Sequence, residues 1–378
     1  MMPARQEIMK ILIAPDKFKG SLTGLEAAHS LEQGWRRARP GDDIRCLPVC
    51  DGGDGFGETL AHLEGASPRI SRTTDASGQI IEASWWWHQA HSKAIIESAT
   101  IIGLARLQPN RLHPFDLDTR GLGTVFSEAQ DLGLTHCVVG IGGSATNDGG
   151  FGMARALGWE FIDSEGRRIE KWTRLDELED LVPPAKQSPF QSLIIASDVA
   201  NPLLGPQGAS RIYGPQKGLL ASDMEKAEAC LGRLAQLLDS MRGHRWREAP
   251  GAGAAGGLGY GLMAFLGGVA ESGFQYFAKL ADLEKRILWA DLVVTGEGSL
   301  DASTCMGKGV GELASICQRH RVPCVAAGGI VQTNETLSRL FKDIYSICPS
   351  LTDPDSSQKN PGFWLAELGE QIARRWTT

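Results

Sequence analysis

Acidic side chains, lysines and polar glycine turns gather where the strands of this sequence are expected to end. They are Lys17 and Lys19, Asp51, residues 144–148, Asp198, and Glu297 with Asp301. Open parallel sheets bind ligands at the carboxyl ends of their strands. Carboxylates, lysines and glycine turns in such places are typical of sites that hold cations and phosphates together.

The first glycine-rich turn, residues 140–150, reads GIGGSATNDGG and passes from a strand toward a helix. Glycines allow positive φ, so that several backbone N–H groups can point at one anion. A helix N-terminus adds about half a positive charge. The alternative is a plain tight turn capped by Ser144 or Asn147, but such a turn needs fewer glycines. The pattern therefore favours an anion site.

The second glycine-rich segment, residues 251–261, reads GAGAAGGLGYG. It contains G-x-G-x-x-G, but no strand precedes it, so it does not fit a dinucleotide fingerprint. Two alternatives stay open, a loop over nucleotide phosphates and close packing of a helix. Lys308 lies in MGKG, which lacks the first glycine and the Ser/Thr of a P-loop. It either reaches a phosphate or is a solvated residue that opens a helix.

The predicted strands and helices that position these residues follow one pattern near both ends of the chain and another in the middle. Strand, polar turn and helix alternate near both ends of the chain, which predicts a parallel sheet with helices on its faces. In the middle, residues 69–74, 80–87 and 93–97 look like hairpin strands, which suit a mixed sheet. We therefore predict an α/β protein. Residues 1–68 and 288–378 would form a discontinuous doubly wound domain, and residues 69–287 an inserted α/β domain with a mixed sheet.

Composition narrows the classes of partner. The 378 residues carry a net charge of −7, which argues against a nucleic-acid partner, because such partners demand basic surface. The N-terminal apolar stretch is too short for a signal peptide, and no segment approaches the roughly 18 apolar residues of a membrane span. The eight cysteines form no C-x-x-C pair and fit a reducing compartment. We expect a cytoplasmic protein with small-molecule partners, and the oligomeric state stays open.

Six ordered segments resemble the type I glycerate kinases, the bacterial glycerate 2-kinase family. They are APDKFKGSL (14–22), DGGDG (51–55), GIGGSATNDGG (140–150), SDVANPLLGPQGASRIYGPQKG (197–218), PGAGAAGGLG (250–259) and TGEGSLD (295–301). The resemblance implies a flavodoxin-like domain that carries an inserted α/β domain. It also implies Mg²⁺-dependent transfer of the ATP γ-phosphate to D-glycerate, with 2-phosphoglycerate as the product.

Three positions depart from the family pattern. Asp54 stands where many members have Glu, and Ser299 where many have Arg, which removes a cation. The third is a tyrosine-glycine-threonine-glycine stretch of the family, which appears here as Arg120-Gly121-Leu122-Gly123, with Leu122 in place of threonine. The larger motifs are undisturbed.

Phosphoryl transfer requires positioning and neutralisation of charge, which assigns roles to the residues above. We expect Asp198 to orient the acceptor hydroxyl and take its proton, and Lys17 to act on the phosphates. The expected nucleotide-binding residues are Gly253, Gly256, Gly257 and Lys308. The expected magnesium ligands are Glu297 and Asp301, with Asp51 next. The expected glycerate-binding residues are Lys19, Ser144, Asn147, Asp148 and Arg211.

Three other functions stay open at this point. The chain could phosphorylate another small hydroxy acid, or glycerate at its 3-hydroxyl. It could also be a non-catalytic anion-binding protein, although such a protein has no need of the clustered carboxylates.

Overall fold

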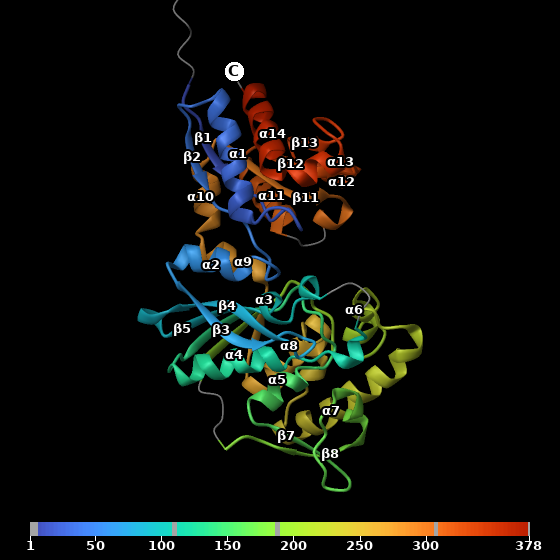
Figure 1. Ribbon diagram of the computed structural model, residues 1–378. Coiled ribbons are helices and arrows are strands. Elements are labelled where there is room, and N and C mark those ends of the chain that lie inside the picture. The colour runs from blue at the N-terminus through green and yellow to red at the C-terminus, as the bar shows by residue number, and fades with distance from the viewer. Residues whose placement is uncertain (1–6, 108–111, 186–189, 306–308, 377–378) are drawn as a thin grey trace, which may run out of the picture. The chain divides into compact units, whose positions relative to one another are not determined.

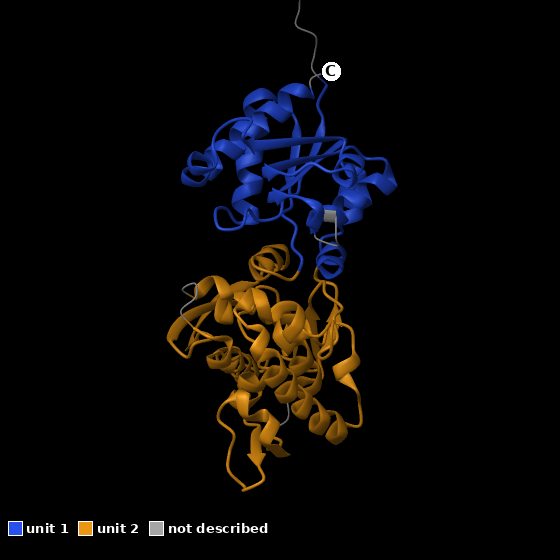
Figure 2. Ribbon diagram, turned by 90° about the vertical axis from the view of Figure 1, so that its right-hand side faces the viewer, with its two compact units in different colours: residues 1–51, 274–378 blue, residues 52–273 orange. Residues whose placement is uncertain are grey.

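The computed structural model describes residues 7–107, 112–185, 190–305 and 309–376. The chain forms two compact units, which Figure 2 distinguishes by colour. Unit 1 comprises residues 1–51 and 274–378, and unit 2 comprises residues 52–273. These limits differ from the expected domain limits at 68/69 and 287/288. One reason is that helix α2 (Phe56–Glu64) packs on strands of unit 2.

Unit 1 is built on a five-stranded sheet whose strands are all parallel (Figure 1). Its strands are β1 (Lys10–Ile13), β2 (Asp43–Cys46), β11 (Leu292–Leu300), β12 (Cys324–Val331) and β13 (Asp343–Cys348). Their spatial order is β13-β12-β11-β1-β2. In order of appearance along the chain this is 5-4-3-1-2, the flavodoxin-like arrangement read from its far edge. The predicted fold of this part of the chain is confirmed.

Helices cover the sheet of unit 1 on both faces. The helices of this unit are α1 (Gly24–Ala38), α10 (Leu283–Trp289), α11 (Gly309–His320), α12 (Glu335–Leu340), α13 (Pro354–Lys359) and α14 (Pro361–Arg375), and α9 (Gly273–Leu280) begins at the last residue of unit 2. Ile11 and Ile13 pack with α1 and α14 in one core cluster. The chain moves in opposite directions across the sheet after β1 and after β11. Right-handed crossovers therefore place α1 and α11 on opposite faces.

Unit 2 contains a six-stranded mixed sheet of order β10-β9-β6-β5-β4-β3. Its strands are β3 (Ser67–Thr74), β4 (Ile80–His88), β5 (Lys93–Glu97), β6 (His136–Gly140), β9 (Ser192–Ala196) and β10 (Val269–Glu271). The pairs β3/β4 and β4/β5 are antiparallel and the other pairs are parallel. The mixed sheet expected in the middle of the chain is confirmed. A separate hairpin joins β7 (Glu160–Asp163) and β8 (Leu178–Val182).

The helices of unit 2 pack on this sheet and on one another. Besides α2 they are α3 (Ala99–Ile102), α4 (Arg120–Asp131), α5 (Phe151–Ala156), α6 (Ala209–Lys217), α7 (Met224–Arg242) and α8 (Ala254–Leu266). Leu122, one of the departures from the family pattern, is fully buried in α4, so it serves the core of this unit. No helix among the described residues is long and apolar enough to cross a membrane.

The tryptophan triplet on β4 shows how this sheet is covered on both faces. Trp85 is fully buried and donates a hydrogen bond to Ser71 Oγ at 2.8 Å. Trp86 points to the opposite face, where a Cβ at Gly57 of α2 would lie 2.1 Å from its ring. Successive side chains of a strand alternate between faces, which accounts for both contacts. Trp85 and Trp86 therefore pack within the protein on the two faces of the sheet.

Candidate active site

A cavity of about 670 Å³ opens at the carboxyl ends of β1 and β11 in unit 1. These strands are neighbours at the point where the strand order reverses, the usual ligand site of a doubly wound sheet. Its volume lies within the range of small-molecule sites. The charged residues that line the cavity are Asp16, Lys17, Lys19, Asp51, Glu297 and Asp301. All but Asp16 were expected from the sequence, and the structure brings them into one cavity.

Asp16 is a site residue that sequence reasoning missed. The residue is 8% exposed, and its Oδ1 accepts a hydrogen bond from the Lys17 backbone N–H at 2.7 Å. Burial raises the pKa of Asp16 to about 7; the Lys17 charge opposes this, whereas Asp51 and Glu297 add to it. As the first polar residue after a buried strand, Asp16 could have been recognised by its position.

Thr304 connects the two acidic residues at the end of β11. Its fully buried Oγ1 donates to Glu297 Oε1 at 2.7 Å and accepts from the Asp301 N–H at 3.2 Å. Asp301 Oδ1 in turn accepts from the Ser303 hydroxyl at 2.6 Å. The short 3₁₀ turn Ala302–Cys305 therefore fixes both carboxylates. Sequence reasoning did not single out Thr304.

The chemistry of this donor set fits magnesium. The carboxylates of Asp51 and Glu297 both act electrostatically on Asp16, so a cation placed there would relieve repulsion. In the described part of the chain, no three His, Cys, Asp or Glu side chains are grouped as a metal cage. Magnesium does not require one, because it keeps several waters and uses one or two carboxylates with substrate phosphates. Lys308, expected at the phosphates, lies outside the described residues.

Ser299 stands where many members of the family have an arginine. Ser299 lines the same cavity, and its hydroxyl lies 3.5 Å from Asp301 Oδ2. At this position the cavity is therefore lined by a hydroxyl and not by a guanidinium group.

In unit 2, Asp148 organises the first glycine-rich turn. Its side chain is fully buried, and its oxygens accept from the Thr119 hydroxyl at 2.8 Å and from the N–H groups of Gly150 and Gly152 at 3.1 and 2.9 Å. Burial raises its pKa to about 6. These bonds fix the turn to the start of α5 and to the loop before α4. This placement favours a supporting role, and direct contact with glycerate stays a prediction.

The same turn is bonded to helix α6. Asn147 is fully buried, and its Nδ2 donates to Ser210 Oγ at 2.9 Å. Ser144 is nearly buried, with its hydroxyl 3.0 Å from that of Thr146. Arg211 follows Ser210 on α6 and its side chain is exposed. The structure therefore places Arg211 and the turn of residues 144–148 on two adjoining elements of unit 2, whereas Lys19, also expected at the glycerate carboxylate, lines the unit 1 cavity.

The second glycine-rich segment packs tightly against the first. Gly256 has φ +71°, and a Cβ there would lie 2.0 Å from the Thr146 carbonyl oxygen. Gly257 has φ +84°, and its Cβ would lie 3.0 Å from Gly149 Cα. Gly253 donates its N–H to the Asn201 carbonyl at 2.8 Å. Helix packing, one of the two alternatives left open by the sequence, accounts for these glycines. A role at phosphates stays a prediction. We call residues 144–150 with 253–257 the glycine seam.

Asp198 follows β9 at the carboxyl edge of the mixed sheet. Its side chain is exposed, and its Oδ1 accepts from the Ser272 hydroxyl at 2.5 Å. Ser272 follows the neighbouring strand β10, so the carboxylate is oriented by the next strand end. An exposed, oriented carboxylate can accept a proton from a substrate.

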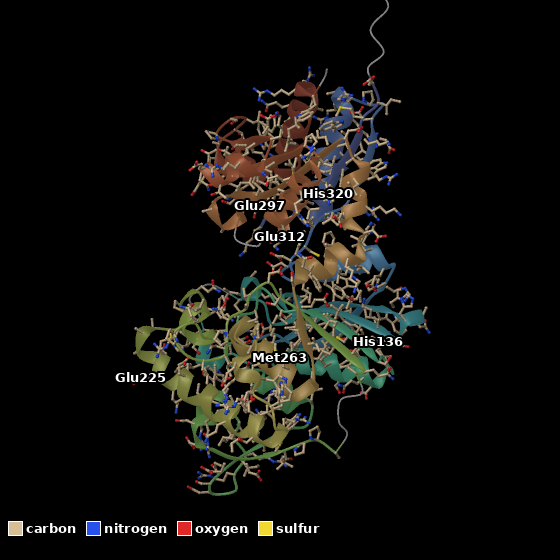
Figure 3. All side chains as sticks on the ribbon, turned by 180° about the vertical axis from the view of Figure 1, so that it is seen from behind. His136, Glu225, Met263, Glu297, Glu312 and His320 are labelled. Carbon is tan, nitrogen blue, oxygen red and sulfur yellow. The ribbon has the colours of Figure 1, made fainter. Side chains whose placement is uncertain are left out.

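The site residues thus form two groups, each within one unit. Glu297, labelled in Figure 3, belongs to the unit 1 cavity with the lysines and the other carboxylates. Asp198, Arg211 and the glycine seam belong to unit 2. Lysines and carboxylates in the first group suit a phosphorylated ligand, and a carboxylate and an arginine in the second suit a small acid.

Comparison with known proteins gives a consistent result. Residues 11–377 match the model of the glycerate kinase family. The chain is 34% identical to a glycerate kinase of Bacillus subtilis, over 97% of each chain. It is 36% identical to the glycerate 2-kinase of Escherichia coli K12, over 85% of each. A crystal structure of a proposed glycerate kinase 2 from Salmonella typhimurium LT2 superimposes with a TM-score of 0.81 at 33% identity, covering 98% of each chain. The chain therefore belongs to the glycerate kinase family and is a kinase.

Proposed function

We propose that this kinase transfers the γ-phosphoryl group of ATP to the 2-hydroxyl of D-glycerate, with Mg²⁺, and releases 2-phosphoglycerate and ADP. The observation that carries the proposal is the cavity at the β1/β11 switch point, where two lysines face four carboxylates. The Escherichia coli relative, named a glycerate 2-kinase, supports the choice of the 2-hydroxyl.

The cationic side of the cavity would hold the nucleotide phosphates. Lys17 lies in the turn after β1 and would offer its ammonium group to phosphate oxygens, and Lys19 in the same turn, expected from the sequence at the glycerate carboxylate, is proposed here as a second phosphate contact. Charge spreads over the equatorial oxygens of the transferred group, so positioned cations stabilise the transition state. Lys308 remains a proposed third contact.

The acidic side of the cavity would hold magnesium. Glu297 and Asp301 are the proposed ligands, with Asp51 and Asp16 beside them. The ion, when bound, would neutralise charge on the phosphate oxygens. Thr304 would keep the Glu297 carboxylate in position by the hydrogen bond that it donates.

Unit 2 would supply the acceptor groups. Arg211 and the turn that contains Ser144 would bind the glycerate carboxylate. The Asp198 carboxylate would take the proton of the acceptor hydroxyl, whose oxygen forms a bond to the γ-phosphorus while the bond to the bridging oxygen of ADP breaks. Asp198→Asn would then lower kcat/KM by about 10²-fold or more.

Phosphorus NMR of the product made from D-glycerate and ATP tests the proposal, because 2- and 3-phosphoglycerate give distinct spectra. A signal of 3-phosphoglycerate alone would overturn the assignment of the hydroxyl. A panel of small hydroxy acids, scored by ADP release, tests the substrate: faster turnover of another acid would overturn glycerate. Ligand-induced melting shifts without any ADP release would overturn phosphoryl transfer altogether.

A further inference from the structure

Helix α6 of unit 2 carries an unusual buried face. Ser210, Gly214 and Lys217 follow one another at helical spacing and are all buried, with Lys217 only 8% exposed. The inward face of a helix is normally apolar, and lysine is almost never fully buried without a partner. Two polar residues on this face therefore indicate specific contacts.

Both polar residues contact the same short turn. Lys217 Nζ donates to the Thr146 carbonyl at 2.7 Å, and Ser210 Oγ accepts from Asn147 Nδ2 at 2.9 Å. Residues seven apart lie two turns apart on one helix face. The helix is thus fastened at both ends to two consecutive residues of the turn, although more than sixty residues separate them in sequence.

The Lys217 ammonium also has an electrostatic partner. Burial lowers the pKa of Lys217 to about 7, and the charge of Asp148 opposes that shift. Asp148 itself orders the turn by accepting from the N–H groups of Gly150 and Gly152. The lysine therefore bonds the middle of the turn and attracts the carboxylate at its end.

We propose that Lys217 is a positioning residue, which fixes the turn of residues 144–148 relative to α6 and so sets the position of Arg211 against that turn. The inference rests on the proposed function, in which Arg211 and the turn bind the glycerate carboxylate. Lys217 does not touch the substrate. It acts through the Thr146 carbonyl and through the charge of Asp148.

The test compares Lys217→Met with wild-type enzyme in steady-state kinetics. Methionine keeps the length and most of the volume of the side chain but removes the donor and the charge. We expect the KM for D-glycerate to rise about tenfold or more, as loss of a charged hydrogen bond does. The KM for ATP should stay within about twofold of wild type, because the change is confined to the acceptor groups. A fall in kcat and in melting temperature with both KM values unchanged would overturn the proposal, since that is the result of a purely structural role.

Two further variants sharpen the test. Ser210→Ala removes the fastening at the other end of α6 and should also raise the KM for D-glycerate selectively, which keeps the proposal testable even if Lys217→Met does not fold. Lys226→Met is the matched control. Lys226 lies on the surface of α7, its side chain is 41% exposed, and it forms an ion pair with Asp176. This variant should leave both KM values unchanged. Selective effects of Lys226→Met as large as those of Lys217→Met would overturn the proposal.

The wild-type reaction separates this inference from the proposed function. If the wild-type enzyme phosphorylates another hydroxy acid in place of D-glycerate, the proposed substrate is wrong. The same KM comparison is then made with that acid, and a selective rise still supports Lys217. If D-glycerate is turned over and Lys217→Met leaves its KM unchanged, only the Lys217 inference fails.

Discussion

The unit 1 cavity and the glycine seam of unit 2 use similar sequence motifs in opposite ways. In the cavity, the charges of Asp51 and Glu297 add to the effect of burial in raising the pKa of Asp16, and all three side chains line an open space. In the seam, backbone touches backbone, with Gly256 pressed against the Thr146 carbonyl. The charges of the cavity could interact with a ligand but lower the stability of the folded protein. The close packing of the seam fixes the backbone and raises that stability. A motif of glycines and acidic residues at a strand end does not by itself show whether it binds a ligand or packs backbone against backbone.

The largest expected effect is on the seam. Gly256→Ala should destabilise the protein by roughly 3 kcal/mol or more, because the new Cβ meets the Thr146 carbonyl oxygen and φ is positive. Thermal unfolding followed by circular dichroism measures this. Gly243→Ala is the matched control, since Gly243 has φ +68° and nothing within 4 Å of its Cβ position. It should cost only about 1 kcal/mol. Equal losses in the two variants would show that close contact does not hold the seam together.

The next effect is on the cavity, and on activity instead of stability. Lys17→Ala should lower kcat/KM by about 10²-fold or more, because it removes a cation that would contact the phosphates. Lys342→Ala, at an exposed lysine that does not line this cavity, should behave as wild type. Near-normal turnover by Lys17→Ala would remove this residue from the mechanism.

A smaller effect is expected at Thr304. Thr304→Val keeps the shape of the side chain but loses the hydrogen bonds to Glu297 and Asp301, so kcat/KM should fall by roughly tenfold. Calorimetric titration with Mg²⁺ and ADP should show weaker metal binding. Thr304→Ser keeps the hydroxyl and should remain close to wild type. If serine and valine reduce activity equally, the hydroxyl does not position the carboxylate.

The smallest effect concerns pH and Asp16. Because the pKa of Asp16 is raised to about 7 in the folded protein, the folded state holds this proton more tightly than the unfolded state. Stability from this group is therefore lost as pH rises from about 4 to about 7. Asp16→Asn does not titrate, so its melting temperature should exceed that of wild type at pH 8. Each kcal/mol gained would raise it by about 2–4 °C.

At pH 4 the difference should largely vanish. A variant that melts lower than wild type at pH 8 would show that Asp16 contributes to stability, and the contrast between cavity and seam would fail. Activity of Asp16→Asn at pH 8 should fall even as its stability rises, because the carboxylate is lost from the cavity.

Much of unit 1 was predictable, because its signals are local. The short β-branched run at residues 10–14 and the polar residues after it predicted a buried strand and the end of it at which a ligand would bind. The same alternation placed Lys17, Lys19, Asp51, Glu297 and Asp301 at strand ends, and they line one cavity. The burial of Asp16 was not predictable, because it depends on strands that lie more than two hundred residues away in the sequence.

The seam was less predictable for the same physical reason. The glycines of residues 251–261 indicated close approach but not the partner, and Gly256 meets a turn about a hundred residues earlier. Lys217 lies in a segment that resembles the family, but nothing in the sequence indicated its burial, because a lysine at the end of a helix usually interacts with the helix dipole in solvent. Its buried contact with Thr146 arises only when α6 packs on the turn.

The strand order of unit 1 has a consequence for biosynthesis. Strand β1 is made first, yet its neighbour β11, the middle strand of the sheet, is made only after the whole of unit 2. At typical ribosomal speeds roughly tens of seconds pass before β11 is available to pair with the free edge of β1. During that interval unit 2 already has all its residues. The order of translation thus makes unit 2 the first body able to fold, and leaves the unit 1 cavity to be completed last.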